Sequence, residues 1–164
     1  MNDKFKEFLR ITKKLNQENI TPLLMGSLGL EYLTKMDWQS ADIDIHVKGD
    51  PRGWEAPDED RIYEWFTIKN VMKKLEYELI DLHEHEFNNG VFNVEFGSMD
   101  SLPKFAGIQL KKLKLVQVDD IQFYLPTAKQ YLKIYQRSSK DSYRADHNNN
   151  KDLPKIEYLK GIVR

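Results

Sequence analysis

Hydrophobic residues recur with a helical period in some segments and with a strand period in others. Near the N-terminus the apolar side chains fall on one helical face, at Phe5, Phe8, Leu9, Ile11 and Leu15. Similar spacing predicts helices over residues 28–36, 61–75, 127–137 and 152–162. Short apolar or alternating runs predict strands at 20–25, 42–47, 77–83, 91–96, 115–118 and 121–125. Helices and strands therefore alternate along most of the chain.

The strand predicted at 42–47 carries two carboxylates among apolar residues. Side chains alternate in a strand, so Asp42 and Asp44 share one face with His46, about 7 Å apart along the strand, while Ile43 and Ile45 point the other way. Desolvating isolated carboxylates is costly unless a cation pairs with them. Mg²⁺ is commonly held by one or two protein carboxylates together with substrate phosphates. The pattern predicts a site for a metal-bound triphosphate, with two Mg²⁺ ions.

A Gly-Ser pair follows the strand predicted at 20–25. Gly26 allows a ligand to approach the backbone closely, and the helix that starts after Ser27 leaves N–H groups free for a phosphate oxygen. Gly26 and Ser27 are therefore candidate phosphate-binding residues. An ordinary helix cap is the alternative interpretation of the same pair.

These two motifs resemble the nucleotidyltransferase superfamily that includes DNA polymerase β and the small antibiotic nucleotidyltransferases. The superfamily pattern is an apolar strand, Gly-Gly or Gly-Ser, a helix, and then Asp-h-Asp-h on the next strand, where h is apolar. Here it is LLMGS over residues 23–27 and DIDI over residues 42–45. The resemblance implies an α/β (α+β) nucleotidyltransferase fold, with a mixed β-sheet flanked by helices, as a single domain over residues 1–164.

The superfamily pattern also requires a third carboxylate on a later strand, and Glu95 is the candidate. In residues 91–96 Phe92, Val94 and Phe96 form the apolar face, so Glu95 lies on the other face. The Asn-Asn-Gly turn at 88–90 predicts a hairpin that brings Glu95 into a sheet with Asp42 and Asp44. The resemblance makes Asp42, Asp44 and Glu95 the catalytic and metal-binding residues.

Within the superfamily the chain looks most similar to the short lincosamide- and aminoglycoside-type enzymes, by length, by order of elements and by the run KDLPKIEYL at 151–159. In the family the late helices face the nucleotide. The resemblance therefore makes Lys133 and Arg137, four positions apart on one helical face, candidate nucleotide-binding residues. Arg144 and Lys151 are comparable candidates. Solvated surface charges are the alternative for all four.

Three further features allow two interpretations each. The sequence HEHE could place His83 and His85 on one face of an extended segment as zinc ligands, although exposed histidines at a strand end are favoured. His46 could touch a phosphate or a substrate hydroxyl, or bond to a carboxylate. Trp54, in the loop predicted at 49–60, could stack on a ring of the substrate or anchor the loop.

The composition limits the cellular location and the binding partners that we expect for this protein. The chain has 164 residues, enough for one compact domain, and no cysteine, which excludes disulfides and thiolate chemistry. It has neither a secretory apolar segment nor a run of roughly 18 apolar residues, so we expect a cytoplasmic protein without a membrane span. The 25 basic and 26 acidic residues give a net charge of −1, which offers no general attraction to long nucleic acid.

The sequence therefore predicts an enzyme, a metal-dependent nucleotidyltransferase that uses ATP or another NTP. It would move a nucleoside monophosphate to a hydroxyl of a small-molecule acceptor and release pyrophosphate. The alternative is a non-catalytic or protein-modifying regulator with a partner protein, such as a component of a toxin–antitoxin pair.

Overall fold

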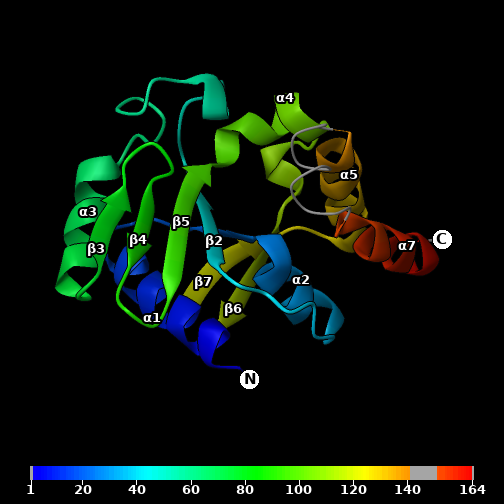
Figure 1. Ribbon diagram of the computed structural model, residues 1–164, viewed down its shortest axis with the longest axis horizontal. Helices are drawn as coiled ribbons and strands as arrows, with labels where there is room; N and C mark the ends of the chain where they lie inside the picture. The colour runs from blue at the N-terminus through cyan, green and yellow to red at the C-terminus, as the bar shows by residue number, and fades with distance from the viewer. Residues whose placement is uncertain (1, 141–150, 164) are drawn as a thin grey trace.

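A seven-stranded mixed sheet forms the centre of the protein (Figure 1). The computed structural model describes residues 2–140 and 151–163. The strands lie in the order β3-β4-β5-β2-β1-β7-β6, and their bounds are β1 Leu23–Met25, β2 Ile43–Val47, β3 Glu78–Asp81, β4 Glu86–Asn88, β5 Asn93–Ser98, β6 Lys114–Val118 and β7 Ile121–Leu125. The pairs β2–β5 and β1–β7 are parallel, and the other neighbours are antiparallel. The mixed sheet confirms the predicted fold class.

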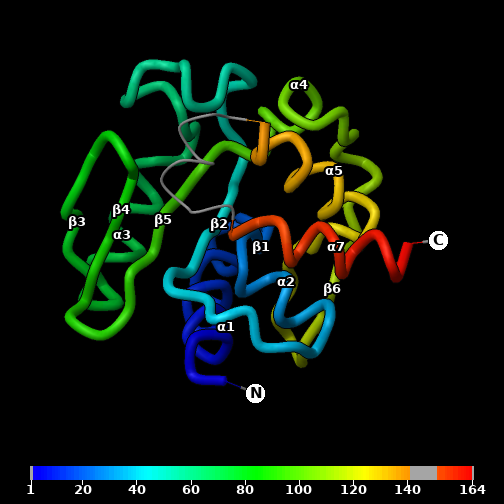
Figure 2. Tube along the Cα trace, turned by 45° about the vertical axis from the view of Figure 1, so that its right-hand side comes forward, coloured from blue at the N-terminus to red at the C-terminus, as the bar shows by residue number. Residues whose placement is uncertain are grey.

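Helices cover both faces of this sheet. Their bounds are α1 Asp3–Gln17, α2 Gly26–Thr34, α3 Trp65–Lys74, α4 Leu102–Ala106, α5 Ala128–Ser139 and α7 Asp152–Ile162, with short 3₁₀ turns η1 Gly53–Glu55, η2 Met99–Ser101 and η3 Leu110–Lys112. Both views show α5 and α7 side by side, next to α2 and away from the β3 edge (Figures 1 and 2). None of the described helices is long and apolar enough to cross a membrane.

Two apolar clusters fix these layers. The larger cluster joins α1 and α3 to the apolar sides of β2 and β5, through residues such as Phe8, Ile43, Ile45, Ile68 and Phe96. Each such buried side chain stabilises the fold by about 1.5–3 kcal/mol. The smaller cluster packs α4 and α5 onto β1, through Leu23, Met25, Leu102 and Ile134. Because one face of β2 and β5 is committed to the larger cluster, their polar residues are left on the opposite face.

Several sequence-based boundaries differ from those of the structure, and two of the differences change the topology. The helix expected to start at residue 61 begins at Trp65, because Ile62 instead forms a β-bridge with Gly49. The strand expected at 77–83 ends at Asp81, and a turn over 82–85 leads into β4, which the hydrophobic pattern did not predict. The predicted hairpin around residues 119–120 is confirmed as β6–β7.

Candidate active site

Asp44 and Glu95 lie side by side on the polar face of the sheet. The parallel register of β2 and β5 pairs Asp44 with Glu95, and the neighbours of both residues along each strand are buried. Asp42 lies immediately before β2 and is more exposed than Asp44. The structure therefore pairs Asp44 with Glu95 and places Asp42 two positions before Asp44, just before the same strand begins.

A fourth carboxylate, Glu86, joins this group and was missed by the sequence-based reasoning. It lies directly opposite Glu95 in the β4–β5 ladder, and the two carboxyl groups share a hydrogen bond. The side-chain amide of Asn93 donates to Glu86 Oε2 at 2.7 Å. The predicted hairpin turn contained a signal for Glu86. Asn88 pairs with Asn93 across this turn, so two positions further from the turn Glu86 pairs with Glu95 on the same face.

The proximity of these acids changes their ionisation. Burial raises the pKa of Glu95 to about 8, and the hydrogen bond with Glu86 and the charges of Asp44 and Asp42 act in the same direction. Burial also raises the pKa of Asp42, helped by the charge of Glu86, whereas a hydrogen bond from Asn93 opposes the change. The site thus concentrates negative charge that a bound cation would relieve.

The chemistry of these side chains fits a hard divalent cation. The group offers carboxylate oxygens, the ligands that Mg²⁺ takes in proteins. Within residues 2–140 and 151–163, no three Asp, Glu, His or Cys side chains already converge as a set of metal ligands. That Asp42, Asp44 and Glu95 are metal ligands stays a prediction, based on the chemistry of their side chains.

The backbone conformation and the surroundings of Gly26 favour glycine at this position. Its φ of +67° lies in the left-handed region, and a Cβ built on it would lie 3.2 Å from Asp44 Cβ and 3.3 Å from Asp44 Oδ2. The close approach follows from the β1–β2 register, which pairs Met25 with Asp44. The Tyr131 hydroxyl of α5 donates to the Gly26 carbonyl at 3.0 Å and holds this turn from the other side. The backbone of the Gly-Ser turn therefore lies directly against the metal-binding candidate.

Ser27 lies in the first turn of α2 and is contacted by α7. The N-cap of α2 is Met25, which makes no side-chain capping bond within the described chain, so Ser27 is not the N-cap residue. Lys155 Nζ donates to Ser27 Oγ at 3.0 Å, and its ammonium also lies 3.8 Å from Asp152. This lysine lies in the run KDLPKIEYL but was not singled out as a candidate. The Lys155 ammonium thus lies beside the residues predicted to bind phosphate, which supports that hypothesis.

We expect Gly26→Val to weaken nucleotide binding far more than Ser27→Ala. Valine adds bulk against the Asp44 carboxylate and strains a backbone with positive φ, whereas alanine removes one hydroxyl hydrogen bond worth about 1 kcal/mol. Calorimetric titration of ATP in the presence of Mg²⁺ measures both. Equal losses in the two variants would contradict the phosphate-binding turn at Gly26.

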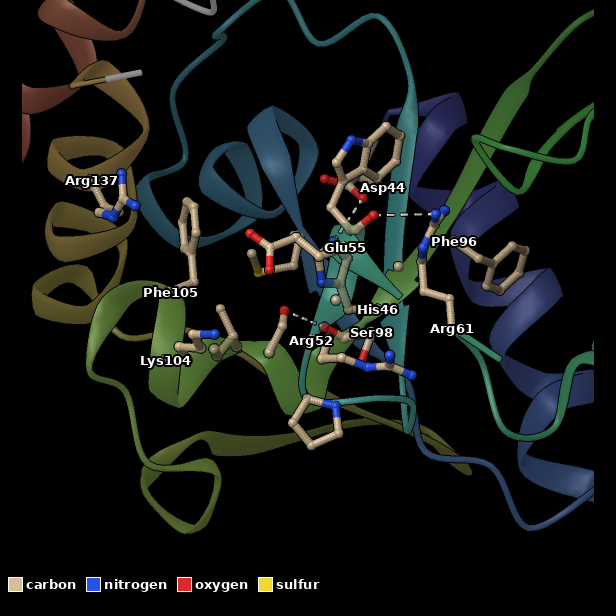
Figure 3. Close-up of a pocket in the computed structure, with 17 residues that line it drawn as sticks. Asp44, His46, Arg52, Glu55, Arg61, Phe96, Ser98, Lys104, Phe105 and Arg137 are labelled. Carbon is tan, nitrogen blue, oxygen red and sulfur yellow. Dashed lines mark hydrogen bonds and ion pairs between the residues drawn. The ribbon is translucent and has the colours of Figure 1, made fainter. Parts of the chain in front are cut away.

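A cavity of about 400 Å³ opens beside Asp44 (Figure 3). Its walls come from the η1 loop, the end of β5, the η2–α4 segment and α5, which contributes Arg137. Lys133 is exposed on α5 and lies outside the set of described residues that line the cavity. The two cations predicted to act together therefore do not share this space.

His46 lies in the same cavity and contacts a carboxylate. Its Nε2 is 3.3 Å from Asp44 Oδ1, which agrees with the second of the two roles proposed for it. Gly97 makes room for the ring, because a Cβ at that position would lie 2.8 Å from His46 Nε2. His46 thus orients the carboxylate that the proposed chemistry depends on.

The expectation that both histidines of HEHE are exposed is wrong for His85. His85 is fully buried, with Nδ1 3.1 Å from the Arg61 guanidinium and Nε2 3.0 Å from the Asp58 carbonyl, and burial and the Arg61 charge lower its pKa. Residues 82–85 form a turn, not an extended segment, so the two rings do not share a strand face. His83 is exposed and bonds to Asp58 at 2.9 Å. These contacts give both histidines a structural role, and the described residues contain no zinc-binding set.

Trp54 makes contacts that fit the anchoring role, and its stacking on a substrate ring stays a prediction. Its ring lies over the Arg61 guanidinium at 4.6 Å and against His83 at 4.8 Å, which anchors the loop. It is nevertheless 57% exposed and lines the cavity beside Asp44. Of the remaining candidates, Lys151 is exposed just before α7, and Arg144 lies outside the described residues.

Two solved structures have the same fold. The antibiotic-resistance factor ANT(2'')-Ia superposes with a TM-score of 0.63 at 11% identity, over 99% of this chain and 86% of that one. An antigenic nucleotidyltransferase-like protein from Paracoccidioides brasiliensis gives a TM-score of 0.64 at 16% identity, over 98% of this chain and 77% of that one. The fold is therefore that of the nucleotidyltransferases, as predicted, and the particular closeness to lincosamide-type enzymes stays a prediction.

Sequence comparison gives a nearer relative. No family model matches the chain. The "uncharacterized protein YnaI" of Bacillus subtilis (strain 168) is 35% identical over 161 residues, which is 98% of this chain and 97% of that protein. Since the similarity runs over nearly the whole of both sequences, the chain belongs to the family of YnaI.

Proposed function

We propose that this protein is a metal-dependent nucleotidyltransferase that moves a nucleoside monophosphate from an NTP to a hydroxyl of a small-molecule acceptor. The observation that carries the proposal is that the Gly26 backbone at the end of β1, Asp44 on β2 and Glu95 on β5 lie next to one another on three adjacent segments of the sheet. The fold shared with a nucleotidyltransferase-like protein and with an antibiotic-resistance factor supports it. We treat residues 1–164 as one catalytic domain.

Each residue has a role that its position supports. Asp42 and Asp44 would hold two Mg²⁺ ions, with Glu95 as a further ligand. When bound, these ions neutralise phosphate charge and align the triphosphate. The N–H groups at Gly26 and Ser27, together with Lys155, would bind the outer phosphates. Lys133 is proposed as an additional nucleotide contact, whereas Arg137 lines the cavity beside Asp44.

The transfer is an in-line displacement at the α-phosphorus. The acceptor hydroxyl loses its proton to Glu95, and its oxygen forms a bond to the α-phosphorus. The bond from that phosphorus to the oxygen of the β-phosphate breaks, and pyrophosphate leaves. Glu95 accepts the proton only when it is ionised, and positive charge beside it favours the ionised form.

A melting-temperature screen of four NTPs with and without Mg²⁺ tests the proposal. A ligand present at about 100 times its Kd adds about 2.7 kcal/mol of stability, and for a chain of this size we expect a rise in Tm of several degrees. The rise should require NTP and Mg²⁺ together, and pyrophosphate release should follow when a panel of hydroxyl compounds is added. If none of the four NTPs gives a Mg²⁺-dependent rise in Tm, the proposed function is overturned.

A regulatory role with a partner protein is the second candidate, and one surface favours it. All four residues of the edge strand β3 are exposed, including Leu79 and Ile80, and Phe66 of the adjacent α3 is 74% exposed. An edge strand with exposed apolar side chains is suited to binding another chain. A stable complex with a co-expressed chain, together with no turnover of NTP, would favour this role.

A further inference from the structure

We propose that the cavity beside Asp44 binds the acceptor, and that it selects a ring compound with an anionic group over a polycation. This inference rests on the proposed function, because it names the acceptor class for the same site. It goes against the aminoglycoside type of acceptor that the family resemblance suggests.

The position of the cavity assigns it to the acceptor. In an in-line displacement the attacking oxygen approaches from the side opposite the leaving pyrophosphate. The phosphate-binding turn at Gly26 lies on the β1 side of Asp44, and Glu95 lies on the β5 side, since the local strand order is β5-β2-β1. The cavity is lined by β5 residues 96–98 just beyond Glu95 and also by Met25 of β1, whereas Gly26 and Ser27 are outside the described residues that line it. A ligand in the part of the cavity next to β5 can therefore present a hydroxyl from the required side.

The side chains that line the cavity suit a ligand with a ring. Trp54 on the η1 loop and Phe105 on α4 are 57% and 38% exposed, although both line the cavity. Arg61 is buried and bonds to the Trp54 carbonyl at 3.5 Å and to the Ala56 carbonyl at 3.4 Å, which fixes the loop. The buried side chain of Leu102 adds further apolar surface. Ligand pockets of this kind bind an apolar body and use a few polar groups for specificity.

The charges favour an anionic group. Two of the four cations in the walls are matched by carboxylates, Arg52 by Asp50 at 2.8 Å and Arg61 by Asp58 at 3.1 Å. Within residues 2–140 and 151–163, Lys104 and Arg137 form no ion pair, and the Arg137 guanidinium lies 5.3 Å from the centre of the Phe105 ring. These three side chains lie together on one side of the cavity (Figure 3). Apart from Asp44, Glu55 is the only carboxylate among the described lining residues. The positive charges of Lys104 and Arg137 therefore repel a polycation and attract an anion.

Binding of three probes to the full chain tests the inference by ligand-observed NMR. The probes are 4-nitrophenyl β-D-glucuronide, the uncharged 4-nitrophenyl β-D-glucoside and the polycation kanamycin. We expect the glucuronide to bind about fivefold more tightly than the glucoside, the scale of a partly exposed ion pair, and kanamycin to bind most weakly. Lys104→Gln should remove the preference for the glucuronide, and Trp54→Ala should weaken both nitrophenyl probes. Lys129→Gln, an exposed lysine of α5 away from the cavity, is the matched control and should change nothing.

The outcomes separate this inference from the proposed function. Kanamycin binding as tightly as the glucuronide, or an unchanged preference in Lys104→Gln, would overturn the anionic class. The same samples are also tested for stabilisation by ATP with Mg²⁺. Nucleotide stabilisation without probe binding would overturn only the acceptor cavity. Probe binding without nucleotide stabilisation would overturn the acceptor role, because it removes the reaction that the role requires.

Discussion

Asp44→Asn is expected to abolish the Mg²⁺-dependent stabilisation by ATP or GTP and to lower turnover by roughly 1,000-fold or more, the scale for losing a group that stabilises transition-state charge. Asparagine keeps the size of the side chain but removes the charge that a cation needs, at the residue that contacts both His46 and the Gly26 turn. Calorimetry of ATP with Mg²⁺ and pyrophosphate release measure the two effects.

The fold should survive this change, because it also relieves repulsion among the four carboxylates. We expect the Tm of the metal-free variant to equal or exceed that of the parent. Asp119→Asn is the matched control, an exposed aspartate in the β6–β7 turn with φ of +55°, a conformation that asparagine tolerates. Nucleotide stabilisation of the Asp44 variant equal to that of the parent would rule out the two-metal site.

Glu95→Gln is expected to reduce turnover strongly and to spare much of the NTP binding. The amide cannot take the proton of the acceptor hydroxyl, whereas Asp42, Asp44 and the Gly26 turn remain to hold the nucleotide. The change should therefore appear in kcat more than in the affinity for ATP. Full turnover in this variant would remove Glu95 from the mechanism and favour the binding-only alternative.

The same substitution should change how stability depends on pH in metal-free buffer. The fold raises the pKa of Glu95 from 4.5 to about 8, so the folded protein favours the protonated form. This contribution to stability is fully present below pH 4.5 and is lost as the pH rises towards 8. After allowance for solvent screening, we expect a loss of about 2 kcal/mol over that range. Glu95→Gln should flatten the profile, and Glu18→Gln, at an exposed position after α1, should leave it unchanged.

Strand alternation was enough to predict the polar face of the site. The order of apolar and polar residues placed Asp44 and Glu95 opposite the core, and the hairpin turn before β5 was visible as Asn-Asn-Gly. The pattern could not reveal β4, which is only three residues long and follows a tight turn. Glu86 has no apolar alternation around it, and only the strand pairing across the Asn-Asn-Gly turn indicates its position.

No local pattern in the sequence predicts the long-range side-chain contacts. Nothing near Arg61 predicts that its guanidinium is buried against His85 from the turn before β4, and nothing near Lys155 predicts a bond to Ser27. These contacts depend on how the loop and the last helix fold back over the sheet. The cavity beside Asp44 could not be predicted for the same reason, because its walls come from segments that are far apart in the sequence.

The parallel pairing of β2 with β5 has a consequence for how the site forms during folding. Asp44 and Glu95 meet only through this pairing, and the chain between them includes α3 and the β3–β4 hairpin. Contacts between residues so far apart in sequence carry a large loop-closure entropy and form slowly. The carboxylates, whose mutual repulsion opposes the pairing, should therefore meet late in folding. Added Mg²⁺ should then act mainly by slowing unfolding and have little effect on the refolding rate.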